Sequence, residues 1–261
     1  MPESHGDVVV ELRQGPKGGQ VARVTIAREA KLNALNTPLI RRFVAAMAEL
    51  SAHEELRAVV LTGAGPKAFV GGADLREMSE IQGGAGATAF IEGVHACCAA
   101  VRDCPVPVIA RINGYTLGAG LELAAACDLR IAAETAHFGM PEVLVGIPSV
   151  VEAALLPGLI GWGRARRLLL LGETIPAAEA ERWGLVERVV APGTLDAAVE
   201  EWLAQLCAAG PRAIRNQKAL IRQWEDLPLS EAVAAGVTAF GRAWDSEEPR
   251  LMMREFLGRR R

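Results

Sequence analysis

The sequence predicts an α/β fold that ends in a mostly helical part. Short apolar strand candidates alternate with helical segments up to about residue 145, a pattern typical of parallel sheets with crossover helices. Beyond that point, helical segments interrupted by Pro and Gly dominate, and only GLVERVV at residues 184–190 indicates a strand. With 261 residues, of which 51% are hydrophobic and 23% charged, the chain suits one domain, or one domain with a helical appendage.

The first elements are predicted from turn residues and β-rich runs. Residues 8–13 and 20–27 flank GPKGG, a Gly/Pro turn cluster, so we expect a β-hairpin at the start of the chain. Thr37 and Pro38 then supply an N-cap and a first-turn proline for a helix at residues 39–53. An apolar strand at residues 58–62 follows.

The next elements alternate between strand and helix. Strands are expected at residues 106–112 and 129–132, and helices at residues 89–101 and 117–127. Gly83 to Gly86 has the composition of a mobile loop near a site, or of a plain surface loop. The remaining helices are predicted at residues 150–160, 164–171, 177–183, 195–208, 212–224 and 230–244.

Composition and charge exclude several classes of protein. The formal net charge of −3 gives no overall basic field that would attract nucleic acid. Residues 1–11 lack a signal-peptide core, and no window approaches the ~20 uninterrupted apolar residues of a membrane span, so we expect a cytoplasmic protein without membrane contact. The five cysteines are odd in number and show no CxxC spacing, which indicates reduced thiols, and the four histidines show no metal-ligand spacing.

Three segments combine small residues with an acidic residue at the apparent end of a strand. They are KAFVGGADL (Lys67 to Leu75), NGYTLGAGLELAAACD (Asn113 to Asp128) and FGMPEV (Phe138 to Val143). Glycines let the backbone turn sharply and expose N–H groups, and the first N–H groups of a helix have no partner within it. Two such N–H groups from two loops are what a developing oxyanion requires.

Two glutamates in these segments are candidates for proton transfer. Glu122 is the one charged residue between Leu117 and Cys127, and Glu142 follows 20 positions later (142 − 122). If both carboxylates approach one pocket, burial and mutual repulsion raise at least one pKa, so that one group holds a proton while the other stays ionised. The pair would then serve as acid and base. The alternative is a buried ion pair of Glu122 with Arg111 or Arg130.

These motifs, in this order, resemble the crotonase superfamily, and enoyl-CoA hydratases most closely. The similarity runs from REAKLNALN at residues 28–36 to LGRRR at the end of the sequence, and it is specific because KAFVGGADL, NGYTLGAGLELAAACDLRIA and AHFGMPEV occur together. The resemblance implies a crotonase-like spiral core of ββα units over residues 1–195. It further implies a helical region at residues 196–261 that mediates trimerisation and completes the coenzyme A (CoA) site, with trimers commonly stacked in pairs.

The resemblance also implies roles for individual residues. The backbone N–H groups of Ala73 and Ala119 would hold the thioester oxygen as the enolate forms. Glu122 would help to activate water for attack at C3, and Glu142 would deliver a proton to C2. The CoA path would be lined by Ala30, Lys31, Leu32, Gly71, Asp74, Leu75 and Gly118, with Arg259 meeting the CoA phosphates. The acyl-CoA thioester is then the substrate, and no separate cofactor or metal is expected.

Two departures from the family pattern concern the subfamily and its acyl specificity. Ala119 stands where relatives usually have glycine, and GIPSVVEAALLP replaces a glycine-rich run after Glu142, with Ser149 at a place close to the water. Hydration of a trans-2-enoyl-CoA is the predicted activity. The alternatives are a Δ3,Δ2-enoyl-CoA isomerase, which can work with one carboxylate, and a noncatalytic acyl-CoA-binding protein, which would be expected to lose a glutamate or a small oxyanion residue.

Overall fold

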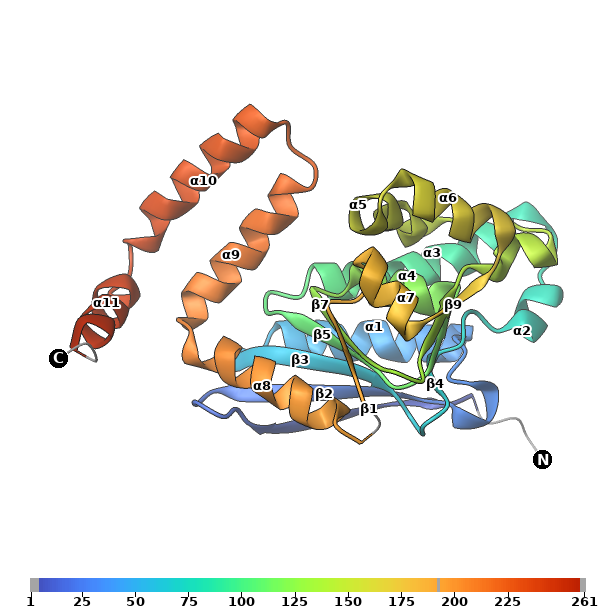
Figure 1. The fold of residues 1–261 in the computed structure, drawn as a ribbon, viewed down its shortest axis with the longest axis horizontal. Coiled ribbons are helices and arrows are strands. Elements are labelled where there is room, and N and C mark those ends of the chain that lie inside the picture. The colour runs from blue at the N-terminus through green and yellow to red at the C-terminus, as the bar shows by residue number, and fades with distance from the viewer. Residues whose placement is uncertain (1–4, 192, 259–261) are drawn as a thin grey trace.

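Two β-sheets form the framework of the chain (Figure 1). The structure, a computed structural model, describes residues 5–191 and 193–258. The larger sheet consists, in spatial order, of β1 (Asp7–Gln14), β2 (Gln20–Ala27), β3 (Leu56–Gly63), β5 (Val108–Ile112), β7 (Leu129–Ala133) and β10 (Arg188–Val190). The smaller sheet consists of β4 (Ala68–Val70), β6 (Tyr115–Leu117), β8 (His137–Gly139) and β9 (Thr174–Pro176).

The chain repeats the order strand, strand, helix. The first pair, β1 and β2, lies in the larger sheet, whereas in the pairs β3–β4, β5–β6 and β7–β8 the first strand enters the larger sheet and the second enters the smaller sheet. Strands β2, β3, β5, β7 and β10 are parallel to one another, as are β4, β6 and β8, whereas β1 is antiparallel to β2 and β9 is antiparallel to β8. The expected ββα spiral is therefore confirmed. The helical elements that follow the strand pairs are α2 (Leu75–Ser79), α3 (Gly83–Arg102), α4 (Ala119–Ala126), η2 (Pro141–Val145), η3 (Val151–Leu155), α5 (Leu156–Ile160) and α6 (Trp162–Leu171), with α7 (Ala177–Trp183) between β9 and β10.

Helices cover both faces of the larger sheet. On β3, Val59 and Leu61 belong to the main core with α1 (Thr37–Ser51), α3 and α4, whereas Ala58 and Val60 pack with α8 (Leu195–Ala208). This alternation is the period of two expected of a strand that is buried on both faces. The antiparallel pairing of β1 with β2 confirms the predicted hairpin.

Several local predictions were wrong for identifiable reasons. Asn36, not Thr37, caps α1, because the Asn36 side chain accepts a hydrogen bond from the Leu39 N–H group. The stretch from Gly83 to Gly86, expected to be a loop, forms the first turn of α3. The sequence did not predict β4, β6, β8 or β9, because three residues are too few to show an alternating pattern.

One described helix, α3, is long and apolar enough to cross a membrane by length and composition alone. Its Phe90, Val94, Cys97 and Val101 side chains are buried in the main core, and the helix packs against α1 and α4. The side of α3 that faces the core is therefore apolar.

The last three helices, α9 (Pro211–Trp224), α10 (Leu229–Ala243) and α11 (Glu248–Gly258), extend away from both sheets (Figure 1). Lys218 anchors α9 to the core: its buried Nζ donates to the carbonyl oxygens of Val101 and Val106 and to Asp128 Oδ2, at 3.2, 3.0 and 2.6 Å. The predicted division at residues 195/196 falls at the start of α8, which packs on the larger sheet. The projecting part therefore begins at α9, and its role in assembly stays a prediction.

Candidate active site

Three loops leave neighbouring strands at the same edge of the smaller sheet. Ala68 on β4 pairs with Tyr115 on β6, and Thr116 on β6 pairs with Phe138 on β8, with all three strands parallel. Because the carboxyl ends of parallel strands point the same way, the segments after Val70, Leu117 and Gly139 emerge side by side. The Gly118 N–H group donates to the Gly139 carbonyl oxygen at 2.9 Å and fixes two of these loops together.

Two backbone N–H groups are exposed by this arrangement. Around Ala73, the Leu35 N–H group donates to the Gly72 carbonyl and the Asp74 N–H group donates to the Leu35 carbonyl, both at 2.8 Å. Ala119 is the first residue of α4, where helix N–H groups lack internal partners. Among the described residues, neither the Ala73 N–H group nor the Ala119 N–H group has a hydrogen-bond acceptor. Both are therefore available to an oxygen atom of a ligand.

Two glycines fix the position of the second loop. Gly118 has a φ of 51°, and a Cβ added to it would lie 2.3 Å from Glu142 Oε1. A Cβ added to Gly120 would lie 1.9 Å from the Val70 carbonyl oxygen, so α4 begins almost in contact with β4. Only glycine fits at these two places, and this requirement keeps the second N–H group close to Glu142.

Glu122 is buried on α4, with 3% of its surface exposed. Burial, together with the negative charges of Glu142 and Glu152, raises the pKa of Glu122 to about 8, although the backbone N–H groups of Ala153 and Val150 oppose the change. At neutral pH Glu122 therefore holds a proton in the free protein.

The alternative ion pair for Glu122 is wrong, because both arginines are engaged elsewhere. Arg111 donates to both carboxylate oxygens of Asp196, and Arg130 pairs with Glu187.

Glu142 is half-buried in η2, directly after β8. The Ser149 Oγ hydroxyl donates a hydrogen bond of 2.8 Å to Glu142 Oε2, while Oε1 faces Gly118. Ser149 thus lies beside the Glu142 carboxylate. The effect of Glu142 on the pKa of Glu122 means that the two carboxylates share one electrostatic environment.

The residues predicted to line CoA also come together, except that Asp74 is engaged by the protein itself and Arg259 cannot be placed. The Gly71 N–H group donates to the Leu32 carbonyl at 2.8 Å, which places the exposed turn of Ala30, Lys31 and Leu32 beside the first loop. Leu75 is exposed at the start of α2, and Gly118 lies in the second loop. Arg259 lies outside the described residues.

Asp74 is engaged by hydrogen bonds within the protein itself. Its Oδ2 atom pairs with Arg28, and its Oδ1 atom accepts from the N–H groups of Arg76 and Glu77 at the start of α2. Burial raises the pKa of Asp74, but these hydrogen bonds and the charge of Arg28 outweigh it, so that the pKa is lowered overall. Asp74 therefore holds the first loop in place and has no oxygen without a protein partner.

Glu152 is a third carboxylate that sequence reasoning missed. It lies in η3, is 6% exposed, and is close enough to raise the pKa of Glu122. The signal in the sequence was that Glu152 is the one charged residue in the run IPSVVEAALLPGLI at residues 147–160. In the described ranges, no three His, Cys, Asp or Glu side chains are grouped so as to hold a metal ion.

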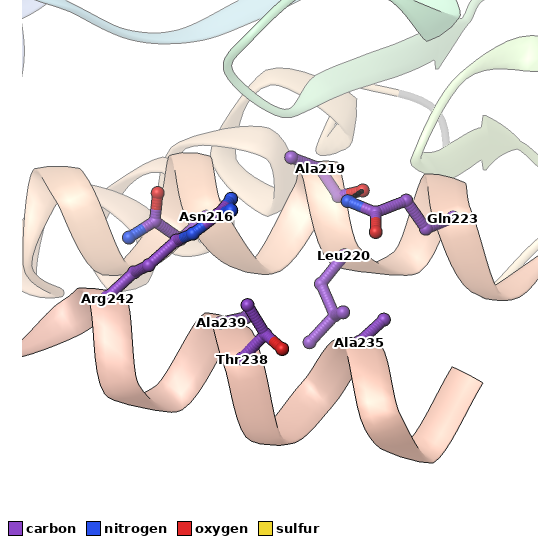
Figure 2. A pocket seen from close by; sticks show the side chains of 8 residues that line it. All are labelled: Asn216, Ala219, Leu220, Gln223, Ala235, Thr238, Ala239 and Arg242. Carbon is purple, nitrogen blue, oxygen red and sulfur yellow. Dashed lines mark hydrogen bonds between the residues drawn. The ribbon is translucent and has the colours of Figure 1, made fainter. Parts of the chain in front are cut away.

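A separate cleft lies between α9 and α10 (Figure 2). It encloses about 350 Å³ and is lined by both helices, with Asn216, Gln223, Thr238 and Arg242 among its polar residues. It contains none of the carboxylates or loops described above. The edge of the smaller sheet is therefore the candidate active site.

Comparison with known proteins identifies the family of the chain. The family model described as enoyl-CoA hydratase/isomerase matches residues 17–261. The chain is 37% identical over 246 residues to the short-chain-enoyl-CoA hydratase of Clostridium acetobutylicum, covering 94% of each chain. It is 33% identical to the crotonyl-CoA hydratase of Syntrophomonas wolfei, again over 94% of each. The crystal structure of enoyl-CoA hydratase from Bacillus anthracis superposes with a TM-score of 0.91 at 31% identity, covering 97% of this chain and 96% of that one.

Glu122→Gln is predicted to stabilise the fold by an amount that grows with pH. Native Glu122 keeps its proton up to about pH 8, whereas the unfolded chain loses it near the ordinary value of 4.5. The unfolded state therefore binds fewer protons in this window, and wild-type stability falls as pH rises through it. Because glutamine does not titrate, the difference in free energy of unfolding between variant and wild type should grow between about pH 5 and pH 8 and then level off.

Denaturant unfolding at several pH values measures this difference. Glu49→Gln is the matched control, because it makes the same chemical change at an exposed position of α1 and leaves the buried carboxyl group of Glu122 in place. A pH-independent difference for Glu122→Gln would contradict the raised pKa.

Proposed function

Because the chain belongs to the enoyl-CoA hydratase/isomerase family, we propose that it is a hydro-lyase that adds water across the C2–C3 double bond of a trans-2-enoyl-CoA thioester. The observation that carries this proposal is the convergence of two unpartnered N–H groups and two glutamates at one edge of the smaller sheet. The same catalyst runs the reverse dehydration, since both directions share one transition state.

The N–H groups of Ala73 and Ala119 act on the thioester oxygen. Attack of water at C3 moves electron density through C2 to the carbonyl, and the resulting enolate oxygen carries negative charge. Two backbone donors that are fixed in advance stabilise that charge at no cost in reorganisation, and loss of one such donor typically costs about 2.7 to 4 kcal/mol. Because the backbone donates, the methyl side chains at these positions serve to leave room for the thioester.

The two glutamates work with one shared proton. In the free enzyme that proton is on Glu122, because burial and the neighbouring negative charges disfavour its ionised form. Water that is held between Glu122 and Glu142 can pass this proton from the first carboxylate to the second. Ionised Glu122 then takes a proton from the water as its oxygen bonds to C3, and Glu142 delivers a proton to C2, so that atoms and charges balance over the cycle.

CoA enters as part of the substrate, so the proposed reaction uses no separate cofactor and no metal ion. The turn of Ala30, Lys31 and Leu32 lies beside Gly71 and forms one wall of the route to the N–H groups. The neutral backbone and the apolar side chains of Ala30 and Leu32 suit the pantetheine arm. Lys31 lies in the same turn and would offer a positive charge to a phosphate group of CoA. We assign contact with the CoA phosphates to Arg259 as well.

The projecting helices are proposed to mediate assembly into a homotrimer, or a pair of stacked trimers. Leu229, Val237 and Phe240 on α10 are 81%, 70% and 69% exposed, and Phe256 and Leu257 continue the apolar surface on α11. A monomer that left these side chains in water would carry an unusually large apolar surface. Burial against neighbouring subunits removes that surface from solvent.

Purified protein is predicted to hydrate crotonyl-CoA or a longer trans-2-enoyl-CoA. Loss of the enone absorbance follows the reaction, and the product identifies it, because an isomerase would move the double bond without adding water. Glu122→Gln and Glu142→Gln should each lower kcat by about 10²- to 10⁴-fold, the usual contribution of a positioned acid or base. CoA-ester binding without turnover would support a noncatalytic protein, and full activity in either variant would contradict the two-glutamate mechanism.

The kcat/KM of wild-type enzyme is predicted to fall as pH rises through about 8. Above this value Glu122 loses the one proton that the pair holds in the free enzyme, and no acid remains to protonate C2. A pH profile with several enoyl-CoA concentrations at each pH separates this effect from a change in kcat alone. A flat profile up to pH values well above 8 would contradict the shared proton.

Gly118→Ala is predicted to lower kcat by about 10²-fold while the protein stays folded. The new methyl group would lie 2.3 Å from Glu142 Oε1, so the carboxylate must move, and displacements near 1 Å in an active site have effects of this size. Gly161→Ala is the matched control, because Gly161 also has a positive φ of 78° but has no atom within 4 Å of the added Cβ. Equal loss of activity in both variants would show that backbone strain, not the position of Glu142, is responsible.

A further inference from the structure

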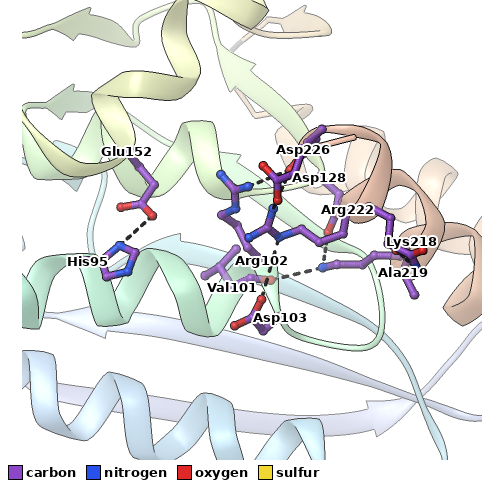
Figure 3. Close-up of polar contacts among 12 residues, drawn as sticks. His95, Val101, Arg102, Asp103, Asp128, Glu152, Lys218, Ala219, Arg222 and Asp226 are labelled. Carbon is purple, nitrogen blue, oxygen red and sulfur yellow. Dashed lines mark hydrogen bonds and ion pairs between the residues drawn. The ribbon is translucent and has the colours of Figure 1, made fainter. Parts of the chain in front are cut away.

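A histidine and a buried carboxylate form a pair on the side of Glu122 that faces α3. His95 Nδ1 on α3 lies 2.9 Å from Glu152 Oε1 on η3, as Figure 3 shows. The side chain of His95 is 57% exposed, whereas that of Glu152 is 8% exposed. The second oxygen, Glu152 Oε2, is buried and has no hydrogen-bond partner among the residues that the structure describes. Within the pair, one end therefore meets solvent and the other lies in the interior.

The segment that carries Glu152 also holds Glu122. The backbone N–H groups of Val150 and Ala153, on either side of Glu152, act on the Glu122 carboxylate. Between them, Val151 has a φ of 39°, a left-handed conformation that is strained for a β-branched residue. The segment packs against both α3 and α4, so its conformation is fixed by its neighbours. Glu152 is thus held at a set distance from Glu122 by a rigid turn.

Among the described residues, His95 is the one basic side chain paired with Glu152. The titratable groups that face this region are Glu122 on α4, Glu142 on η2, and His95, Cys97 and Cys98 on α3. Burial raises the pKa of Cys98 well above its ordinary value, and the charges of Glu152 and Glu122 add to this effect. The thiols are therefore neutral, and α5 contributes no titratable group. Negative charge on Glu152 acts on Glu122, and no lysine or arginine among the described residues pairs with Glu152.

Resting on the hydratase function proposed above, we propose that Glu152 and His95 are positioning residues that set how firmly Glu122 holds its proton. Neither side chain touches the reacting atoms. Charge on Glu152 favours the protonated form of Glu122, and His95 holds the Glu152 carboxylate in place. The pair thereby keeps one proton on the two catalytic glutamates across the neutral pH range. A Glu122 without this neighbour would ionise at lower pH, and the enzyme would lose its acid there.

Glu152→Gln tests the proposal because it removes the charge and keeps the shape. The upper limb of the kcat/KM profile should move to lower pH by roughly one unit, the size expected for one nearby charge in a protein interior. Activity at about pH 6 should stay within about twofold of wild type, since the substrate contacts are unchanged. Glu49→Gln, the same change at an exposed position of α1, should leave the limb in place.

His95→Gln tests whether the histidine acts through Glu152. Added to Glu152→Gln, it should cause no further movement of the limb, because two residues that act along one route are not additive. The proposal is overturned if the upper limb of the kcat/KM profile of Glu152→Gln lies at the same pH as in wild type. It is also overturned if the limb moves further in the double variant. If Glu152→Gln does not fold, Glu152→Met provides an uncharged side chain of similar length for the same measurement.

A second readout separates this proposal from the proposed function. The effect of Glu122→Gln on the free energy of unfolding is measured in wild-type protein and in the Glu152→Gln variant. In wild-type protein this effect should stop growing at about pH 8, and in the Glu152→Gln variant it should stop growing at a lower pH. This shift supports the pair even if wild-type protein hydrates no enoyl-CoA, an outcome that would overturn the hydratase function alone. An unchanged levelling point overturns the pair whatever the activity.

Discussion

The parallel pairing of β4, β6 and β8 is the constraint on which the candidate site depends. These strands have three residues each, yet their register places three loops at one edge and joins the second loop to the third through the hydrogen bond from Gly118 to Gly139. Displacement of one strand by one residue would turn its side chains to the opposite face and separate the N–H groups from the glutamates. The larger sheet supplies stability for this arrangement, because its buried strands β3, β5 and β7 lead directly into the three short ones.

The site places a carboxyl group where its charged form is unfavourable. Glu122 is nearly inaccessible and lies near two further carboxylates, while Arg111 and Arg130 pair elsewhere, so the fold is more stable when Glu122 carries a proton. A protein selected for stability alone would have an apolar residue there. The same environment makes the group useful, since a carboxylic acid that keeps its proton near neutral pH can exchange it with a bound water. Stability is thus reduced at the position where proton transfer is needed.

Much of the fold could be predicted from the sequence, because its long elements have long patterns. Helices α8 and α9 and strands β2, β3 and β7 show hydrophobic periodicity over enough residues to be recognised, and they lie close to the expected places. The smaller sheet has no such pattern, so the convergence of its loops came from the resemblance and not from periodicity. Two buried charges were missed for a different reason: Lys218 and Glu152 have partners far away in sequence, and no local pattern identifies those partners.

The segment GIPSVVEAALLP connects these features, because it supplies a polar neighbour to each of the two glutamates. Ser149 donates a hydrogen bond to Glu142 and so holds this carboxylate in place. Three residues later, Glu152 brings negative charge towards Glu122, which favours the protonated form. A departure from the glycine-rich family pattern thus has a physical consequence: the same turn holds the Glu142 carboxylate and brings the charge that helps to raise the pKa of Glu122.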